Sequence, residues 1–280
     1  MPLRSDQDGA PAPRTVLITG GSGGIGHELA RVFAAHGHNL VLVARDRNRL
    51  LAVSEELETA YGVKAHVVAR DLSLPAAPVE LYRDLRQRSL PVDILVNNAG
   101  FAAGGRFADS DPTNALQLLQ VNVTALTHLT RLFLPDMIQR GWGRLLHVAS
   151  IAAFFPGPLT ACYNASKAYV LSFSHALSNE LQGSGVSSTV LCPGPTQTGF
   201  ARRARLLGTR AFSGRIMEPA DVARVGYEAL MEGKVQAIAG IKNKMRMFPV
   251  PLVPRRVLAY FSRVYHQGCE EPSETVESLT

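Results

Sequence analysis

Ser150, Tyr163 and Lys167 are the residues of this chain whose types and spacing could do chemistry together. Tyr163 and Lys167 are four positions apart, so on a helix their side chains share one face, one turn from each other. A phenol keeps its proton until about pH 10, and a nearby ammonium lowers that pKa by favouring the phenolate. Ser150 could hydrogen-bond the substrate oxygen with which Tyr163 exchanges its proton. The three residues therefore predict a tunable proton donor and acceptor. Because this spacing is common by chance, the prediction depends on whether the chain also has a cofactor site.

A glycine-rich segment near the start of the chain predicts such a site. Residues 14–19 (RTVLIT) are typical of a short buried strand, residues 20–26 (GGSGGIG) follow at once, and residues 27–35 have helical periodicity. Backbone N–H groups and a helix N-terminus then meet where a pyrophosphate can bind. A flexible glycine turn is the alternative, but its place between a strand and a helix favours phosphate binding.

The two features occur with four further motifs in a recognisable order. These are TGGSGGIG at 19–26, Asp71-Leu72, NNAG at 97–100, Asn122, the Ser150/Tyr163/Lys167 set and PGPTQT at 193–198. In this order the chain resembles the short-chain dehydrogenase/reductase family over residues 14–240. The resemblance implies four catalytic residues, Asn122, Ser150, Tyr163 and Lys167. It also implies a nicotinamide-cofactor site made of Gly20, Ser22, Gly24, Ile25, Gly26, Asp71, Leu72, Asn98, Ala99, Gly100, Tyr163, Lys167, Pro193, Gly194, Thr196 and Thr198.

The chemistry that this resemblance implies is hydride transfer between a nicotinamide and a carbonyl or secondary alcohol. Tyr163 would exchange the proton with the substrate oxygen, and Ser150 would orient and polarise that oxygen. Lys167 would lower the pKa of Tyr163 and bind the nicotinamide ribose. Asn122 would hold a water that returns protons to Lys167, and an ordinary helix asparagine is the alternative for it. An apolar ketone or a 3-oxoacyl-type compound is the expected substrate.

Arg45 bears on which nicotinamide cofactor is used. It follows the strand predicted at 39–44, where an acidic residue would bind a free ribose 2′-hydroxyl and repel a 2′-phosphate. A guanidinium can instead grip a phosphate with two hydrogen bonds. The sequence therefore predicts NADP(H), with NAD(H) and a merely solvated Arg45 as the alternatives.

The fold expected is one α/β domain, a Rossmann-like doubly wound parallel sheet of about seven strands with helices on both faces. Continuous apolar runs alternate with amphipathic segments, which is typical of parallel sheets covered on both sides. Strands are predicted at 15–19, 39–44, 64–69, 92–96, 144–149, 187–191 and 235–239, and helices near 25–36, 46–60, 76–88, 112–139, 160–183 and 219–232. Ligands of such sheets bind at the carboxyl ends of the strands, where the motifs fall.

Two basic segments bear on the substrate and on partners. The expected substrate loop, 195–217, carries Arg202, Arg203, Arg205, Arg210 and Arg215 without an acidic residue, so it is either a basic lid for an anionic substrate or a solvated mobile loop. Residues 241–267 form a basic amphipathic extension in which Val257, Leu258, Phe261, Val264 and Tyr265 share one predicted helical face. This helix either contacts a membrane surface peripherally or packs on the substrate pocket or a second subunit. Residues 1–13 and the acidic stretch 268–280 are expected to be mobile tails.

Composition excludes several other classes. The net charge of +6 comes mainly from dispersed arginines without an aromatic-interleaved patch, which argues against nucleic-acid binding. Three scattered cysteines and eight histidines without ligand spacing predict no metal site and a cytoplasmic protein. Family resemblance implies a homodimer or homotetramer through the helices near 112–139 and 160–183. Two rival functions remain, a catalytically silent NADP(H) sensor and a nucleotide-sugar epimerase or dehydratase.

Overall fold

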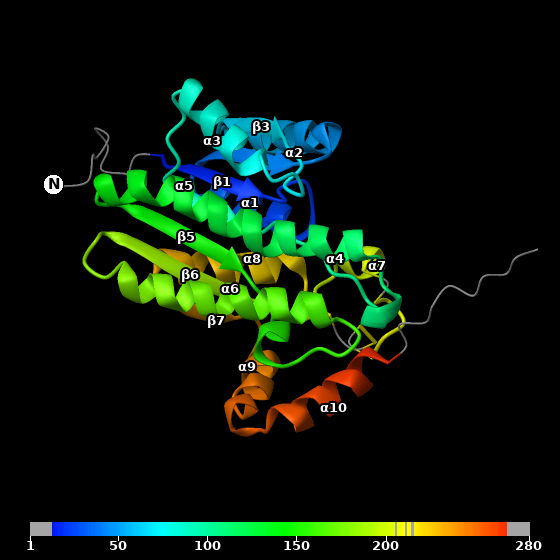
Figure 1. The fold of residues 1–280 in the computed structure, drawn as a ribbon. Helices are drawn as coiled ribbons and strands as arrows, with labels where there is room; N and C mark the ends of the chain where they lie inside the picture. The colour runs from blue at the N-terminus through cyan, green and yellow to red at the C-terminus, as the bar shows by residue number, and fades with distance from the viewer. Residues whose placement is uncertain (1–12, 205, 211, 214–215, 268–280) are drawn as a thin grey trace, which may run out of the picture.

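The described part of the chain is built around one parallel sheet. The computed structural model describes residues 13–204, 206–210, 212–213 and 216–267, so the predicted tails lie almost wholly outside it. The strands are β1 (Thr15–Thr19), β2 (Asn39–Ala44), β3 (Ala65–Ala69), β4 (Ile94–Asn97), β5 (Gly143–Val148), β6 (Val186–Cys192) and β7 (Gln236–Ile238). Within the described residues they form a seven-stranded sheet in the order β3-β2-β1-β4-β5-β6-β7 (Figure 1). The predicted fold class is confirmed.

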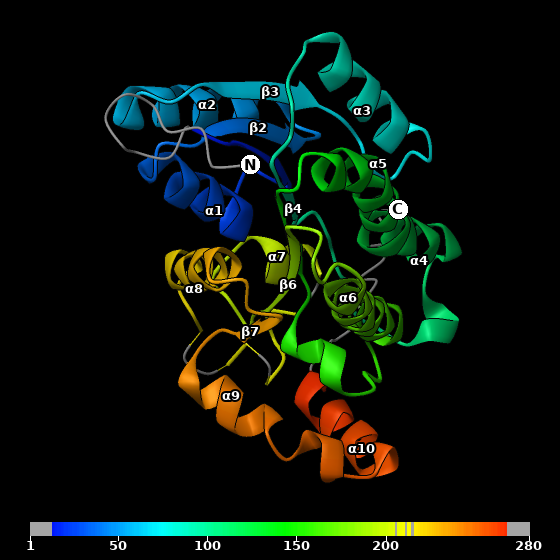
Figure 2. The same ribbon diagram turned by 90° about the vertical axis from the view of Figure 1, so that its left-hand side faces the viewer.

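Helices cover both faces of this sheet, as Figure 2 shows in a view along the strands. One face is covered by α1 (Gly24–Ala35), α2 (Arg47–Tyr61) and α8 (Pro219–Met231), and the other by α3 (Ala77–Gln87), α5 (Leu126–Gln139) and α6 (Ala161–Glu180). Leu29 and Phe33 of α1 are buried in the first layer, and Leu81 and Phe133 in the second. Because both faces of the strands are covered, the strand sequences are continuously apolar rather than alternating.

The helix predicted at 112–139 is interrupted in the structure. It consists of α4 (Pro112–Leu119), a π-helical turn η2 (Gln120–Ala125) and α5. The amide of Asn122 in this turn accepts a hydrogen bond from Phe101 N at 3.1 Å and donates to Phe101 O and Ser166 Oγ, both at 3.0 Å. A π-turn inserts one residue into a helix and changes the apolar pattern too little for the sequence to reveal it. Such turns are frequent at functional sites. The prediction of a continuous helix was therefore wrong at 120–125.

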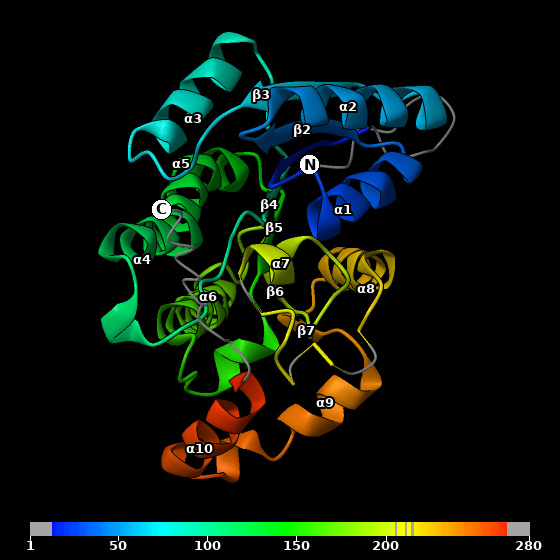
Figure 3. The ribbon, with the colours of Figure 1, turned by 90° about the vertical axis from the view of Figure 1, so that its right-hand side faces the viewer.

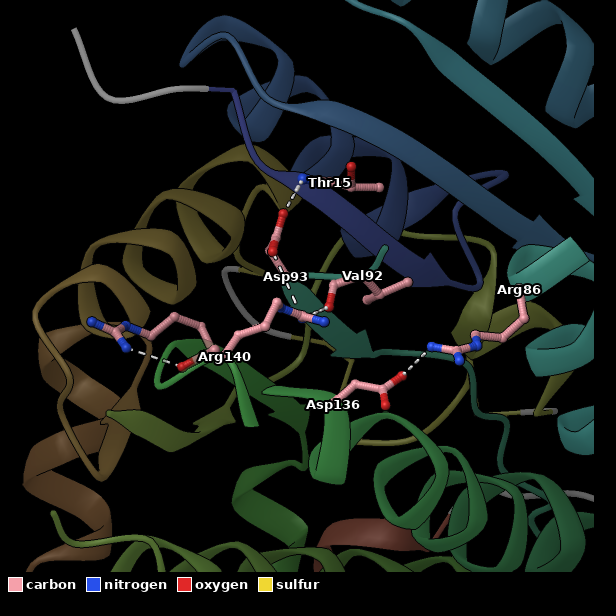
Figure 4. A network of polar contacts seen from close by, with 8 residues as sticks. Thr15, Arg86, Val92, Asp93, Asp136 and Arg140 are labelled. Carbon is pink, nitrogen blue, oxygen red and sulfur yellow. Dashed lines mark hydrogen bonds and ion pairs between the residues drawn. The ribbon is translucent and has the colours of Figure 1, made fainter. Parts of the chain in front are cut away.

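A polar network holds the amino ends of the strands (Figure 4). The carboxylate of Asp93, just before β4, accepts a hydrogen bond from Thr15 N at 3.0 Å and lies 3.7 Å from the guanidinium of Arg140. Arg140 also donates to the carbonyl of Val92 at 2.7 Å. These contacts link β1, β4 and the end of α5 at the sheet edge opposite to the predicted site, so they act in stability rather than in chemistry.

Asn97, the first asparagine of the NNAG motif, has a structural role beneath the site. It is buried, and its amide nitrogen lies 3.0 Å from Thr130 Oγ1 and 3.2 Å from His147 Nδ1. Burial lowers the pKa of His147 to about 4, so at neutral pH this imidazole is uncharged and its Nδ1 can accept the hydrogen bond. Asn97 therefore ties β4 to β5 and α5 beneath the site.

The chain continues past β7 into two short helices at the end of the sheet. These are α9 (Ile241–Met247) and α10 (Arg255–His266), with the 3₁₀ turn η4 (Val250–Leu252) between them (Figures 2 and 3). The apolar face predicted for 255–267 is wrong in part: Val257 and Phe261 are exposed, and the buried positions of α10 are Ser262 and His266. The imidazole of His266 bonds the carbonyl of Ser262 at 2.8 Å, one turn back, which lets this polar residue face inward.

Candidate active site

The predicted site residues gather at the carboxyl edge of the sheet, which faces the viewer in Figure 3. Gly20 follows β1, Arg45 follows β2, Ser150 follows β5, and Pro193 follows β6. The strand order reverses between β1 and β4, since β1 continues to β2 on one side while β4 leads to β5 on the other. Ligands of doubly wound sheets bind in the crevice at this point.

The glycine turn after β1 has no room for side chains. Gly20 has φ +69°, and a Cβ there would stand 2.8 Å from Asn98 Nδ2. A Cβ on Gly26 would collide with the carbonyl oxygen of Gly20, and one on Gly24 would stand 3.0 Å from Thr198 Cγ2. The turn is thus held between the NNAG segment and the segment after β6, and its backbone is open to a ligand.

The start of α1 is suited to a phosphate. Its N-cap, Gly23, makes no side-chain cap, and no acidic residue lies in the first turn. The backbone N–H groups there are consequently available, and the helix dipole favours an anion. Ser22 and Ile25 are half-buried beside them, and Ile25 packs on the core.

Thr19 is a residue of this site that the sequence reasoning quoted but assigned no role. Its hydroxyl accepts hydrogen bonds from the backbone nitrogens of Asn98 and Ala99, both at 3.0 Å, and donates to the carbonyl of Val96 at 3.2 Å. Asn98, in turn, donates its amide N–H to the carbonyls of Thr19 at 2.9 Å and Gly20 at 3.3 Å. The signal for this role was that Thr19 is the first residue of the TGGSGGIG motif, and in the structure it joins that motif to NNAG.

Ser150, Tyr163 and Lys167 come together between β5 and α6. Ser150 caps the 3₁₀ turn η3 (Ile151–Phe154), where its Oγ accepts a hydrogen bond from Ala152 N at 3.1 Å, and it lies close enough to Tyr163 to affect the pKa of the phenol. The ammonium of Lys167 donates to the carbonyl of Val148 at 2.8 Å and lies 5.9 Å from the centre of the Tyr163 ring.

Asn122 and Lys167 both lie beside Gly100, and Asn122 also contacts the catalytic helix through Ser166. A Cβ on Gly100 would stand 3.0 Å from Asn122 Oδ1 and 3.4 Å from Lys167 Nζ, so this glycine keeps the two groups close. The side-chain amide of Asn122 is committed to Phe101 and Ser166. Both N–H groups of the Asn122 amide are donated, its Oδ1 keeps a second lone pair, and its role in holding a water stays a prediction.

Burial shifts the pKa values of Tyr163 and Lys167 in opposite directions. Burial raises the pKa of Tyr163 to about 12, against the opposing effect of the Ser150 hydrogen bond. Burial also lowers the pKa of Lys167 to about 8. Burial therefore sets the direction of the Tyr163 pKa, and the lowering effect expected of Lys167 stays a prediction. At neutral pH Tyr163 carries its proton and can donate it.

The residues expected at the adenine end lie after β2 and β3. Leu72 is buried, and Asp71 accepts a hydrogen bond from Ser73 N at 2.9 Å. Arg45 is exposed and makes no ion pair within the described residues, whereas its neighbour Asp46 caps α2 and pairs with Arg49 at 3.3 Å. Asp46 is thus occupied, and the Arg45 guanidinium is available for an anion.

The segment after β6 is held by its own backbone. The hydroxyl of Thr196 donates to the carbonyl of Gly194 at 2.9 Å, and Thr198 Oγ1 accepts from Phe200 N at 3.2 Å. Pro193 is buried, and the side chain of Asn243 lies directly against Gly194. This segment is thereby positioned opposite the glycine turn, with Thr198 facing Gly24.

An apolar cluster stands over the Tyr163 ring. Phe200, in the short helix α7 (Phe200–Arg203), lies 5.5 Å from Tyr163 between ring centres. The cluster consists of Ala102, Ala204 and Leu206, with Tyr163, Phe200 and Phe212 packed against it. Arg202, Arg203 and Arg210 are exposed around it, and Arg205 and Arg215 lie outside the described residues. The loop thus covers the tyrosine with apolar groups and presents cations to the outside.

In the described ranges, no group of three or more His, Cys, Asp or Glu side chains is placed to hold a metal ion. No helix of the described chain has the length and apolarity needed to span a bilayer.

Comparison with known proteins decides the family. The short chain dehydrogenase family model matches residues 14–206, which contain every predicted catalytic residue. The chain belongs to the short-chain dehydrogenase family. As a member it is an oxidoreductase that uses a nicotinamide cofactor.

Relatives of this short-chain dehydrogenase include reductases. It is 32% identical to the ketoacyl reductase HetN of a Nostoc species, over 80% of this chain and 78% of the relative. It is 36% identical to a very-long-chain 3-oxoacyl-CoA reductase of Meyerozyma guilliermondii, over 66% of this chain but only 57% of the relative. Among solved structures, a Sphingobium yanoikuyae short-chain dehydrogenase in complex with NADPH superposes with a TM-score of 0.75 at 35% identity, covering 80% of this chain and 87% of that one.

Proposed function

We propose that this short-chain dehydrogenase is an NADP(H)-dependent reductase of apolar ketones or 3-oxoacyl-type compounds. The observation that carries the proposal is the buried, protonated phenol of Tyr163 beside Ser150, packed against an apolar cluster with Phe200 and Leu206. A carbonyl oxygen seated at this phenol would have its apolar substituents in that cluster.

The residues present fit a dinucleotide. Side chains at Gly20, Gly24 and Gly26 would collide with neighbouring protein atoms, so the turn keeps a bare backbone, and the uncapped start of α1 offers N–H groups for the pyrophosphate. When bound, the nicotinamide would supply or accept the hydride. Lys167, Thr196 and Thr198 would hold its ribose and carboxamide.

The chain's own residues then carry the proton chemistry. Ser150 would donate a hydrogen bond to the substrate oxygen and fix its position relative to Tyr163. Tyr163 would transfer its phenolic proton to that oxygen as negative charge develops there. The Lys167 ammonium would stabilise the phenolate left behind, and its pKa near 8 also lets it pass a proton on.

The preference for NADP(H) is proposed to rest on Arg45. In Arg45→Asp, a carboxylate replaces the phosphate-binding fork, so kcat/KM for NADPH should fall about 100-fold while kcat/KM for NADH is kept or raised. Steady-state kinetics with each cofactor measures this. Arg83→Asp, the same change at an exposed arginine of α3, is the matched control. Equal losses with both cofactors, or no loss with NADPH, would contradict the role of Arg45.

A 3-oxoacyl thioester is the more specific substrate proposed, because cations surround the apolar entrance. Arg202 and Arg203 are exposed at the end of α7, where an anionic carrier group would lie. With saturating NADPH, the KM for a 3-oxoacyl-CoA should rise steeply with salt, whereas that for a neutral ketone should not. Arg202→Ala/Arg203→Ala should raise the low-salt thioester KM about 10-fold and flatten its salt dependence. Identical salt profiles for both substrates would favour a neutral ketone instead.

A further inference from the structure

The helices α9 and α10 carry a large apolar surface that the enzyme fold does not use. Seven large apolar side chains between 241 and 261 are exposed, and Phe248 and Leu252 are 84% and 85% exposed. We call the following set the C-terminal surface: Ile241, Met245, Phe248, Leu252, Val257, Tyr260 and Phe261. Exposed apolar patches of this kind mark sites of interaction.

The orientation of α10 is fixed by its buried positions. Ser262 and His266 are buried against the protein, one turn apart. On the outward side Val257 and Phe261 are exposed, and the i, i+4 spacing places their side chains next to each other. Val257 and Phe261 therefore face away from the body of the enzyme.

Cations border these apolar residues. The segment 241–267 contains Lys242, Lys244, Arg246, Arg255, Arg256 and Arg263, and it contains no aspartate or glutamate. All six cations are exposed, and within the described ranges none of them forms an ion pair. Apolar and aromatic groups flanked by unpaired Lys and Arg match the chemistry of a bilayer interface with anionic headgroups.

The C-terminal surface is attached to the segment after β6, which belongs to the candidate active site. The amide of Asn243 donates to the carbonyl of Ala239 at 2.8 Å and lies against Gly194 and Met217. Val250 is buried between the two helices. The C-terminal surface is therefore a fixed part of the fold, joined directly to the segment after β6.

We propose that the C-terminal surface binds the face of an anionic lipid bilayer. Its helices have 12 and 7 residues, so at about 1.5 Å per residue neither can cross a hydrocarbon core of about 30 Å, and they would lie in the interface. A second copy of the chain is a poorer occupant, since a two-fold contact would set the same unpaired cations against one another. Lipid binding does not depend on the reductase chemistry, so either could fail without the other.

Co-sedimentation of the full chain with vesicles tests this binding. The protein should pellet with phosphatidylcholine vesicles that contain phosphatidylserine, and far less with phosphatidylcholine alone or at high salt. Phe248→Ser/Phe261→Ser should lower the apparent vesicle affinity about 10-fold or more by removing apolar burial. Arg256→Glu/Arg263→Glu should lower it at least about 30-fold.

Matched variants on the opposite side of the molecule give the controls. Leu51→Ser/Leu74→Ser removes two exposed apolar side chains, and Arg83→Glu/Arg131→Glu makes the same change in net charge. Both should pellet like the wild type, with thermal unfolding checked for every variant. The proposal is overturned if the wild type stays in the supernatant, if the controls lose binding equally, or if Phe248→Ser/Phe261→Ser instead dissociates a wild-type dimer in gel filtration.

Discussion

Tyr163→Phe is expected to abolish turnover while NADPH still binds. The substitution removes only the phenolic oxygen, so the ring keeps its packing against Phe200 and the cofactor cradle is untouched. Loss of the proton donor should lower kcat by about 10³- to 10⁴-fold, the upper range for a general acid. NADPH consumption with a carbonyl substrate measures the loss, and a fluorescence titration measures cofactor affinity.

Tyr169→Phe is the matched control for this result. Tyr169 lies on the same helix, six residues further along, but its side chain is 40% exposed and its hydroxyl lies 3.0 Å from Thr127 Oγ1. It should keep nearly full activity. Retention of most activity in Tyr163→Phe would overturn the assignment of the proton donor.

Replacing Lys167 with methionine is expected to have the next largest effect. Methionine fills the buried space but removes the ammonium that stabilises the phenolate and the donor that would bind the cofactor ribose. The kcat/KM for the carbonyl should fall about 10²- to 10³-fold, comparable to the loss of one oxyanion donor. Activity within a few-fold of the wild type would show that the tyrosine works without this charge.

The charge of Lys167 should also appear in the pH profile. Burial lowers its pKa from 10.5 to about 8, so the ammonium is present below that pH and lost as pH rises through it. Tyr163, with a pKa of about 12, still holds its proton there. Carbonyl reduction by the wild type should thus decline above about pH 8, and Lys167→Arg should keep residual activity without that decline. A decline that persists in Lys167→Arg would belong to another group.

The sheet could be predicted because each strand leaves its signal in a short stretch of sequence. Strands buried on both faces leave continuous apolar runs, and the bounds of β1 and β2 agree with the prediction at both ends. The glycine turn could be predicted as well, because only glycine tolerates the positive φ of Gly20 or the close contact of Gly26 with the carbonyl of Gly20. The position of Tyr163 and Lys167 on one helix also follows from spacing alone.

What could not be predicted depends on partners distant in sequence. The π-turn at 120–125 is associated with the bonds of Asn122 to Phe101 and Ser166, which no local pattern reveals. The spacing shows that Lys167 is near Tyr163, but it does not show that burial raises the pKa of the phenol. For α10, the periodicity predicted an apolar face but gave no sign that Ser262 and His266, rather than that face, would be buried.

The most direct test of the central claim is NADPH consumption by the wild-type enzyme against a panel of ketones, aldehydes and 3-oxoacyl thioesters, with NADH in parallel. The site predicts turnover of at least one apolar carbonyl, faster with NADPH than with NADH, and strongest among the 3-oxoacyl thioesters. Tight NADPH binding with no consumption across the whole panel would contradict the reductase and leave a cofactor-binding sensor in its place.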